Sequence, residues 1–305
     1  MDGPALVLVF DDGFAADYEQ IRPVLDEAGV PACLAIVPDW LGEEGHLDAN
    51  RLAELADDGW EVAAHGRKHR FLQARRLRAD VAPGETEIPV DDHVFPGEAH
   101  AVVAGDEMEL VGESEGDQRN ASDRASGSDR GERHASREEV RVADTVDDGS
   151  GDPVVVVEEL IDGRYAADES VLRPAEALLR DEIVGVREEF RELGYDPTTF
   201  VFPYDAADPR AWEIAAEHYD ALPNAGVRSL PNPPGTPGTN LRRYYLQTTH
   251  ATMPEIETYL DAVAGLAGVG ILAGHSAWDS VPPERVAAVV EEARERGISV
   301  TTFGD

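Results

Sequence analysis

The segment LVLVFDDGF, from Leu6 to Phe14, places two adjacent aspartates and a glycine directly after a run of apolar residues. An uninterrupted apolar run of this length is typical of a strand that is buried on both faces. A turn at the end of such a strand needs only one Asp before the glycine. The pair Asp11–Asp12 therefore indicates a chemical function, in which one carboxylate holds a group and its neighbour acts as a base.

Short β-branched segments alternate with amphipathic segments on both sides of this motif and in the C-terminal half of the chain. We expect strands at residues 5–10, 32–37, 61–64, 198–202, 241–246, 269–273 and 298–303. We expect helices at residues 17–28, 49–58, 173–193, 209–218, 254–266 and 283–296. This alternation, with nearly continuous apolar strands, predicts an α/β fold with a parallel sheet, either open or closed into a barrel.

The region from 79 to 172 breaks this pattern. Residues 112–139 contain no Val, Ile, Leu, Met or aromatic residue, and such a segment cannot bury a hydrophobic core. It is flanked by HAVVAGDEMELVG and DPVVVVEELIDGRY, which have the character of strands. We therefore expect residues 79–172 to form a β-rich insertion with a disordered tip at about 112–139, between barrel segments 1–78 and 173–305.

The composition excludes some classes of partner. The net charge is −36, which argues against nucleic acid and against anionic membranes as ligands. Lys68 is the only lysine, and the acidic residues are spread along the whole chain; this pattern favours a halophilic source, in which high salt screens the repulsion. Cys33 is the only cysteine, and neither a signal peptide nor a membrane-spanning run is evident. If the printed chain is complete, we expect a cytoplasmic protein.

Three polar clusters follow expected strands: Asp11–Asp12, the segment HGRKH with His65 and His69, and the segment GHS with His275. The carboxyl ends of parallel strands form one rim, so these clusters should meet in space. Two histidines four residues apart and one carboxylate can form an open divalent metal site. A bound metal lowers the pKa of water from about 15.7 towards 7, and the aspartate that is not a ligand can then accept the proton.

These segments, together with the helix LLRDEIVGVREEFRELG and the segment TTFVFPYD, resemble the successive motifs of the polysaccharide deacetylase family (NodB homology, carbohydrate esterase 4), in a haloarchaeal-type sequence. The resemblance covers about 1–72 and 173–305. It implies a distorted (β/α)7-type barrel that hydrolyses N-acetyl groups of amino sugars with a divalent metal, usually zinc, cobalt or nickel.

The resemblance also implies residue roles. Asp11 corresponds to the catalytic base, and His275 corresponds to the catalytic acid. Asp12, His65 and His69 correspond to the metal ligands. Pro203 and Tyr204 fall on a motif of the groove wall, in which the backbone N–H of the tyrosine helps to hold the oxyanion.

The sequence departs from the family motifs at four places. Gly66 stands where Ser or Thr is usual, Val201 stands where an arginine normally orients the base, Asp205 stands where glycine is common, and Ala273 stands where leucine is normal. All three expected metal ligands remain, so these departures bear more on the substrate class than on the metal site.

Another arginine is available to orient the base. The segment LRRYYL carries Arg242 and Arg243 on an expected strand, and period-two alternation directs them to opposite faces. We favour Arg243 as the inward residue, because some relatives carry an arginine three residues before an aliphatic residue on a similar strand, as Arg243 precedes Leu246. Trp278, three residues after His275, is a further candidate for the wall of the sugar groove.

The sequence therefore predicts a metal-dependent hydrolase that removes acetyl groups from an N-acetylated glycan or a related small amide. Two alternatives stay open. One is a cyclic-amide or ureide hydrolase on the same fold. The other is a non-catalytic glycan-binding module, although such a module needs neither the base at Asp11 nor the acid at His275.

Overall fold

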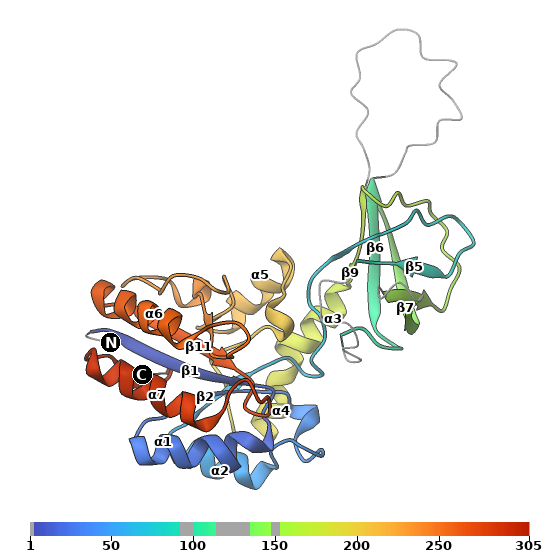
Figure 1. The fold of residues 1–305 in the computed structure, drawn as a ribbon. Helices are drawn as coiled ribbons and strands as arrows, with labels where there is room; N and C mark the ends of the chain where they lie inside the picture. Colours follow the sequence, from blue (N-terminus) through green and yellow to red (C-terminus); the bar gives the residue numbers. More distant parts are fainter. Residues whose placement is uncertain (1–2, 92–100, 114–134, 148–152, 305) are drawn as a thin grey trace. The chain divides into compact units, whose positions relative to one another are not determined.

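The computed structural model describes residues 3–91, 101–113, 135–147 and 153–304 (Figure 1). The chain divides into two compact units, the first formed by Met1–His69 with Arg180–Asp305 and the second by Arg70–Leu179. The second unit extends beyond the expected insertion at 79–172. The reason is that Arg75 and Arg76 pair with Leu172 and Val171, so residues on both flanks belong to the strands of the second unit.

The first unit is built on parallel strands. β1 (Ala5–Asp11) pairs with β2 (Cys33–Ile36), and β2 pairs with β3 (Glu61–Ala64). β1 also pairs with β11 (Val269–Gly274), which pairs in turn with β10 (Tyr244–Tyr245). β12 (Ser299–Thr301) lies beside the first half of β1. Each of these strands falls within, or within one residue of, a segment expected from the sequence.

Isolated β-bridges and single backbone hydrogen bonds connect β3 to the segment that leads into β10, and they close the barrel. They involve residues 198–202 and 241–243, which were expected to be strands but pair too briefly to form regular ones. The connecting pairs are Ala64–Phe200, Thr199–Ala221, Leu222–Leu241 and Gly226–Arg243.

Small and branched apolar side chains fill the interior of this barrel. One buried cluster takes residues from successive strands around it: Val7, Val9, Cys33, Ala35, Ala63, Val201, Ala221, Leu241, Ile271 and Ala273. The closed parallel arrangement confirms the predicted α/β barrel. It also brings the carboxyl ends of the strands to one rim, where barrel enzymes carry their active sites.

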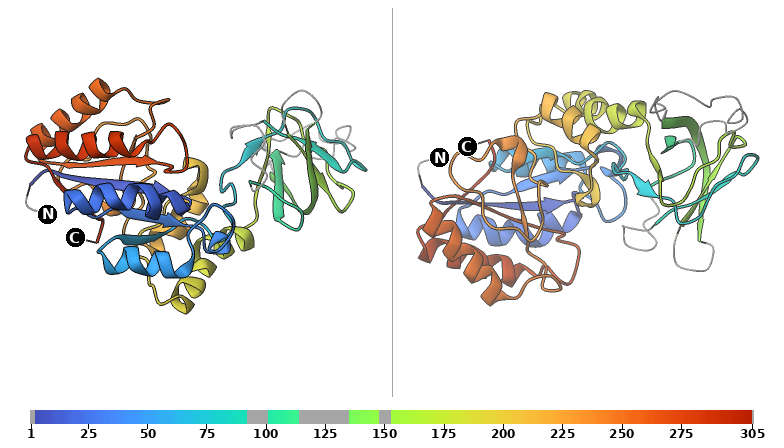
Figure 2. Two further views of the ribbon diagram at one scale, coloured as in Figure 1. Left: turned by 60° about the horizontal axis from the view of Figure 1, so that its bottom comes forward. Right: turned by 90° about the horizontal axis from the view of Figure 1, so that it is seen from above.

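Helices surround the strands of the first unit (Figures 1 and 2). They are α1 (Arg22–Ala28), α2 (Ala49–Asp57), α4 (Val186–Glu192), α5 (Pro209–His218), α6 (Met253–Leu266) and α7 (Pro283–Glu295). Two π-helical segments, Asp17–Ile21 and Asp181–Gly185, precede α1 and α4. The helix expected from 173 begins instead at Glu176, in α3 (Glu176–Arg180), because residues 173 and 174 end a strand. None of the described helices is long and apolar enough to cross a membrane.

The second unit is an antiparallel barrel with its own core. Its strands are β4 (Arg75–Arg76), β5 (Glu87–Pro89), β6 (Glu107–Glu113), β7 (Ala135–Asp147), β8 (Pro153–Val157) and β9 (Ser170–Pro174), in the spatial order β4-β9-β6-β7-β8-β5. A bridge between Leu77 and Val90 joins the two edge strands. Buried Val, Leu and Ile side chains with Tyr165 fill the interior, as a β-rich insertion requires.

The expected disordered tip at 112–139 needs a correction at both of its ends. Gly112 and Glu113 continue β6 and pair with residues at the start of β7, and Arg137–Glu139 pair with the middle of β6. These polar residues form a strand because the ladder uses backbone groups, which do not depend on side-chain polarity. Residues 114–134 lie outside the described part of the chain.

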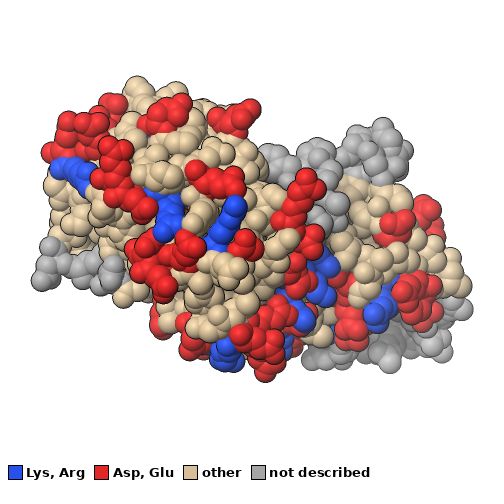
Figure 3. Space-filling view, turned by 90° about the horizontal axis from the view of Figure 1, so that it is seen from below, with Lys and Arg blue, Asp and Glu red and all other residues tan. Residues whose placement is uncertain are grey.

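Among the charged side chains on the face drawn in Figure 3, the acidic ones predominate and form groups, with fewer Lys and Arg between them. The chain carries 62 acidic against 26 basic residues. Mutual repulsion of like charges destabilises a compact state, and salt screens this repulsion over about 3 Å at 1 M compared with about 10 Å at 0.1 M.

We therefore expect the melting temperature to rise by several degrees or more between 0.1 and 2 M KCl. Thermal melts followed by circular dichroism would measure this rise. A melting temperature that is independent of salt would contradict the proposed adaptation to high salt.

Candidate active site

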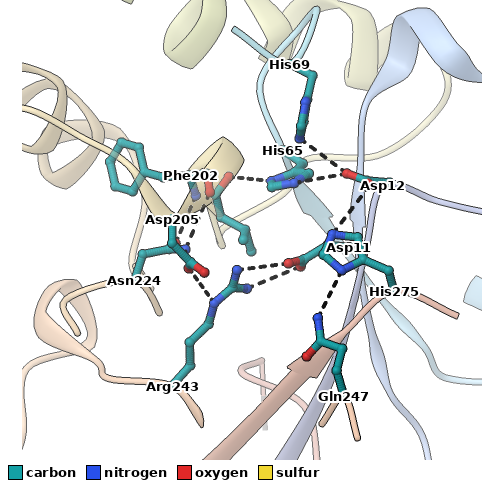
Figure 4. A network of polar contacts seen from close by, with 11 residues as sticks. Asp11, Asp12, His65, His69, Phe202, Asp205, Asn224, Arg243, Gln247 and His275 are labelled. Carbon is teal, nitrogen blue, oxygen red and sulfur yellow. Dashed lines mark hydrogen bonds and ion pairs between the residues drawn. The ribbon is translucent and has the colours of Figure 1, made fainter. Parts of the chain in front are cut away.

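The two aspartates at the carboxyl end of β1, Asp11 and Asp12, face different partners (Figure 4). Asp11 is the last residue of the strand and contacts Arg243, whereas Asp12 turns towards His65 and His69. The turn places Asp12 at φ 78°, in the left-handed region that Asp tolerates better than most residues. Gly13 follows at φ 68°, and a Cβ there would lie 2.7 Å from the Ile36 side chain. The DDG sequence thus separates two adjacent carboxylates into two environments.

Asp12, His65 and His69 form a group of potential metal ligands whose ligating atoms all lie within 4.8 Å of one another. The Nε2 atoms of His65 and His69 lie 3.4 Å and 3.3 Å from Asp12 Oδ1. All three residues are buried, and Asp12 Oδ1 makes no hydrogen bond. Two imidazoles and one carboxylate oxygen suit zinc, cobalt or nickel, and a buried carboxylate oxygen that faces two histidine nitrogens without hydrogen-bonding to them fits a ligand role.

The orientation of His65 is set by a backbone group. Its Nδ1 lies 2.8 Å from the carbonyl oxygen of Val201, so Nδ1–H donates there and the Nε2 lone pair faces Asp12. The Val201 side chain itself packs in the barrel interior. Valine at this motif position therefore contributes a carbonyl acceptor and an apolar side chain. The positive charge that an arginine here would place beside the base has to come from another residue.

A buried glutamate holds the loop between the two histidines. Glu182, in the π-helical segment before α4, is fully buried and accepts the backbone N–H groups of Arg67 and Lys68 at about 3.1 Å. A Cβ at residue 66 would lie 2.8 Å from Glu182 Oε2, and Gly66 adopts φ 72°. The departure from Ser or Thr at position 66 follows from this close approach and this backbone conformation.

Asp11 and Arg243 form a buried two-point contact. Arg243 Nη2 lies 2.9 Å from Asp11 Oδ2 and Nη1 lies 3.3 Å from Oδ1, and both residues are buried. Burial alone would raise the pKa of Asp11, but Arg243, with His65 and His275, outweighs burial and holds this pKa below its usual value. Asp11 is therefore ionised at neutral pH, as a general base must be.

His275 follows β11 and contacts Asp12 through the carboxylate oxygen that does not face His65 and His69. Its Nε2 is 3.5 Å from Asp12 Oδ2, and its Nδ1 is 3.2 Å from Gln247 Nε2. The Trp278 ring stacks on the imidazole at 3.9 Å between centroids and is 39% exposed. The partly exposed indole therefore lies next to the expected acid.

Pro203 and Tyr204 lie on the far side of the metal-ligand group. The Tyr204 ring is 4.4 Å from the His69 ring between centroids, and its backbone takes φ 59°. Pro203 Cγ lies against Gly66, 3.2 Å from where a Cβ would stand. The structure thus brings all nine residues that the sequence nominated to this one rim of the first unit.

Backbone strain gathers at the same rim. Asp12, His69, Tyr204 and Asp205 are four of the six non-glycine residues with positive φ in the described part of the chain. Such conformations cost free energy and persist where the surrounding structure fixes them, typically at functional sites. The strain is therefore an independent indication of a functional site at this rim.

Four further residues belong to the site and were not nominated from the sequence. Gln247 contacts His275, Asp205 contacts Arg243, Asn224 contacts Asp205, and Asp17 is fully buried close to the carboxylates. Gln247 directly follows the LRRYYL strand, so its place at a strand end was a usable signal. The departure from glycine was the signal at Asp205, and nothing in the sequence distinguishes Asn224.

Asp17 offers a prediction on pH. Burial, with the charges of Asp12 and Asp11, raises the pKa of Asp17 from 3.8 to about 8. Between these two values the folded state binds a proton that the unfolded state releases, so this group lowers stability as the pH rises from about 4 to about 8.

We expect Asp17→Asn to be more stable than the parent at pH 8, on the order of a few kcal/mol, and nearly equal to it at pH 4. Denaturant unfolding at the two pH values measures the difference. A variant that gains the same stability at both pH values would show that Asp17 is ionised in the folded state.

The N-terminal part of the chain is similar in sequence to known proteins. Residues 1–86 match the family model described as polysaccharide deacetylase, and this segment contains Asp11, Asp12, His65 and His69. A putative polysaccharide deacetylase, YxkH, of Bacillus subtilis (strain 168) is 28% identical over 64 residues, which span 21% of this chain and 23% of the relative.

The solved structures that match the chain share little sequence with it. A family 4 carbohydrate esterase from Streptomyces lividans is 11% identical with a TM-score of 0.46, over 99% of this chain and 93% of the esterase. A family 4 acetyl xylan esterase from Clostridium thermocellum is 12% identical with a TM-score of 0.45, over 98% of this chain and 88% of the esterase.

Proposed function

We propose that the protein is a metal-dependent hydrolase that removes N-acetyl groups from an amino-sugar polymer or glycan. The observation that carries the proposal is that the two adjacent carboxylates at the end of β1, Asp11 and Asp12, have different partners. Asp12 joins two histidines in a potential metal-ligand group, and Asp11 is kept ionised by Arg243. The match of residues 1–86 to the polysaccharide deacetylase model supports the substrate class.

Asp12, His65 and His69 would hold a divalent ion, most suitably zinc, with cobalt or nickel as alternatives. Once bound, such an ion acts as a Lewis acid on the acetamide carbonyl and lowers the pKa of water. The chain supplies the remaining chemistry from residues on both sides of this group.

Asp11 accepts the proton of the attacking water, because it is ionised and fixed by two contacts with Arg243. The backbone N–H of Tyr204 donates to the carbonyl oxygen as negative charge develops there. His275 then delivers a proton to the amine, which is too basic to leave as an anion. Pro203 and Trp278 line the path of the sugar.

Acetate release from a panel of N-acetylated glycans tests the proposal. We expect release by the metal-loaded protein, loss of release with a chelator, and recovery after metal is added back. Hydrolysis of cyclic amides or ureides without release of acetate would favour the first alternative. Glycan binding without any hydrolysis would favour a binding module.

Arg243 and Arg242 provide a matched pair of variants. Arg243 is buried against Asp11, whereas Arg242 is the neighbouring residue and only partly buried. We expect Arg243→Met to lower kcat by about 100-fold or more, since a base that loses its orientation loses effective concentration. Arg242→Met should change kcat by less than about 2-fold on the same grounds. Equal and mild losses in both variants would remove Arg243 from the mechanism.

A further inference from the structure

Asp205 occupies a backbone conformation that suits glycine better than aspartate. Asp205 has φ 55° and follows Tyr204 at φ 59°, so two consecutive residues with side chains are left-handed. Each costs roughly 1–2 kcal/mol relative to a right-handed residue, and glycine would avoid this cost. An aspartate at this position, despite the cost of its backbone conformation, indicates that its carboxylate has a role.

The carboxylate of Asp205 contacts the edge of Arg243 that Asp11 does not use. Arg243 Nε donates to Asp205 Oδ1 at 2.6 Å, while Nη1 and Nη2 donate to Asp11 (Figure 4). The planar guanidinium therefore lies between two carboxylates, with all three of its nitrogens engaged. Because the donors of a guanidinium form a rigid fork, fixing Nε also fixes the direction of the other two nitrogens.

Asn224 completes the support. Its Nδ2 donates to Asp205 Oδ1 at 2.6 Å, and its Oδ1 accepts the backbone N–H of Phe202 at 2.8 Å. The Asn224 side chain thereby ties Asp205 to the segment just before the left-handed turn. The chain of contacts runs from the backbone at Phe202 through Asn224 and Asp205 to Arg243, and then to Asp11.

We propose that Asp205 is a positioning residue, which holds the Arg243 guanidinium in the orientation that directs the Asp11 carboxylate towards the attacking water. This inference rests on the proposed function and extends it. The arginine that normally accompanies the motif is replaced by Val201 in this chain, and the same motif supplies Asp205 to fix an arginine from the β10 side of the barrel. Without Asp205, the buried Arg243 Nε–H has no carboxylate partner and the two-point contact with Asp11 loosens.

Asp205→Gly and Asp205→Asn test the proposal, because both residues tolerate a positive φ. We expect kcat for glycan deacetylation to fall by about 10–100-fold in Asp205→Gly and by less in Asp205→Asn, as for other supporting contacts around metal centres. KM should change by less than about 3-fold, and metal content should stay native, because neither the ligands nor the sugar contacts are altered. Native circular dichroism and an unchanged or higher melting temperature would show that Asp205→Gly folds.

A double-mutant cycle with Arg243→Lys separates positioning from a general structural role. Lysine keeps the positive charge but has neither Nε–H nor a fork, so Asp205 can no longer orient it. Asp205→Gly should therefore cost less than about 3-fold in the Arg243→Lys background. An equal loss of kcat in both backgrounds, or wild-type kcat in Asp205→Gly, would overturn the inference. Absence of acetate release by the wild-type protein would instead refute the proposed function, and the inference with it.

Discussion

Asp11→Asn is expected to abolish acetate release while the metal content stays near that of the wild-type protein. The asparagine side chain has the same shape and can still accept a hydrogen bond from Arg243, but it cannot take a proton from water. General-base catalysis by a positioned side chain contributes about 10²–10⁴-fold to the rate. The loss should be at the upper end of this range, because Asp11 is buried, ionised and held by Arg243. Metal should remain bound, since Asp11 is not a member of the ligand group of Asp12, His65 and His69.

Asp12→Asn is the matched control, because it makes the same chemical change at the adjacent residue. We expect this variant to lose metal, since a neutral amide oxygen is a weak ligand for zinc. Metal content by elemental analysis and acetate release by an enzymatic assay distinguish the two variants. If Asp11→Asn lost metal and Asp12→Asn kept it, the roles of the two aspartates would have to be exchanged.

The barrel and the residues at its rim could be predicted from the sequence because both depend on local patterns. Apolar strands such as Ala5–Asp11 define themselves by composition, and a polar residue at the end of a parallel strand lies at the shared rim wherever the strand falls in the sequence. Asp12, His65 and His69 were therefore predictable as a group, although 53 positions separate Asp12 from His65.

The support of the site could not be predicted in the same way. The contact between Asp205 and Arg243 joins residues 38 positions apart, on segments that form no regular strand pair, so it depends on how the barrel closes. At Val201 the sequence showed only that an arginine is absent. The Val201 carbonyl accepts a hydrogen bond from His65, and a backbone contact of this kind leaves no signal in the side chain. The polar start of β7 was likewise unpredictable, since its residues pair through the backbone with β6.

His65→Ala is expected to remove both the bound metal and the activity. In the described part of the chain, Asp12, His65 and His69 form the group of side chains that could hold a metal ion. Because all three are buried, few other side chains can replace a lost ligand. Loss of one of three protein ligands should lower affinity by well over 100-fold, since even supporting contacts outside the ligand set are worth 10–100-fold. Addition of metal at moderate concentration should therefore not restore acetate release.

Thermal stability provides a readout of metal binding that does not depend on activity. An ion that binds only the folded state stabilises it by about 2.7 kcal/mol when its concentration is 100 times Kd. The melting temperature of the metal-free wild-type protein should thus rise when zinc, cobalt or nickel is added, and that of His65→Ala should not. His218→Ala is the matched control, because His218 ends α5 and is not part of the ligand group, so this variant should respond as the wild-type protein does. A rise in His65→Ala equal to that of the wild type would mean that the ion binds elsewhere, and the buried group at the end of β1 would then not be the metal site.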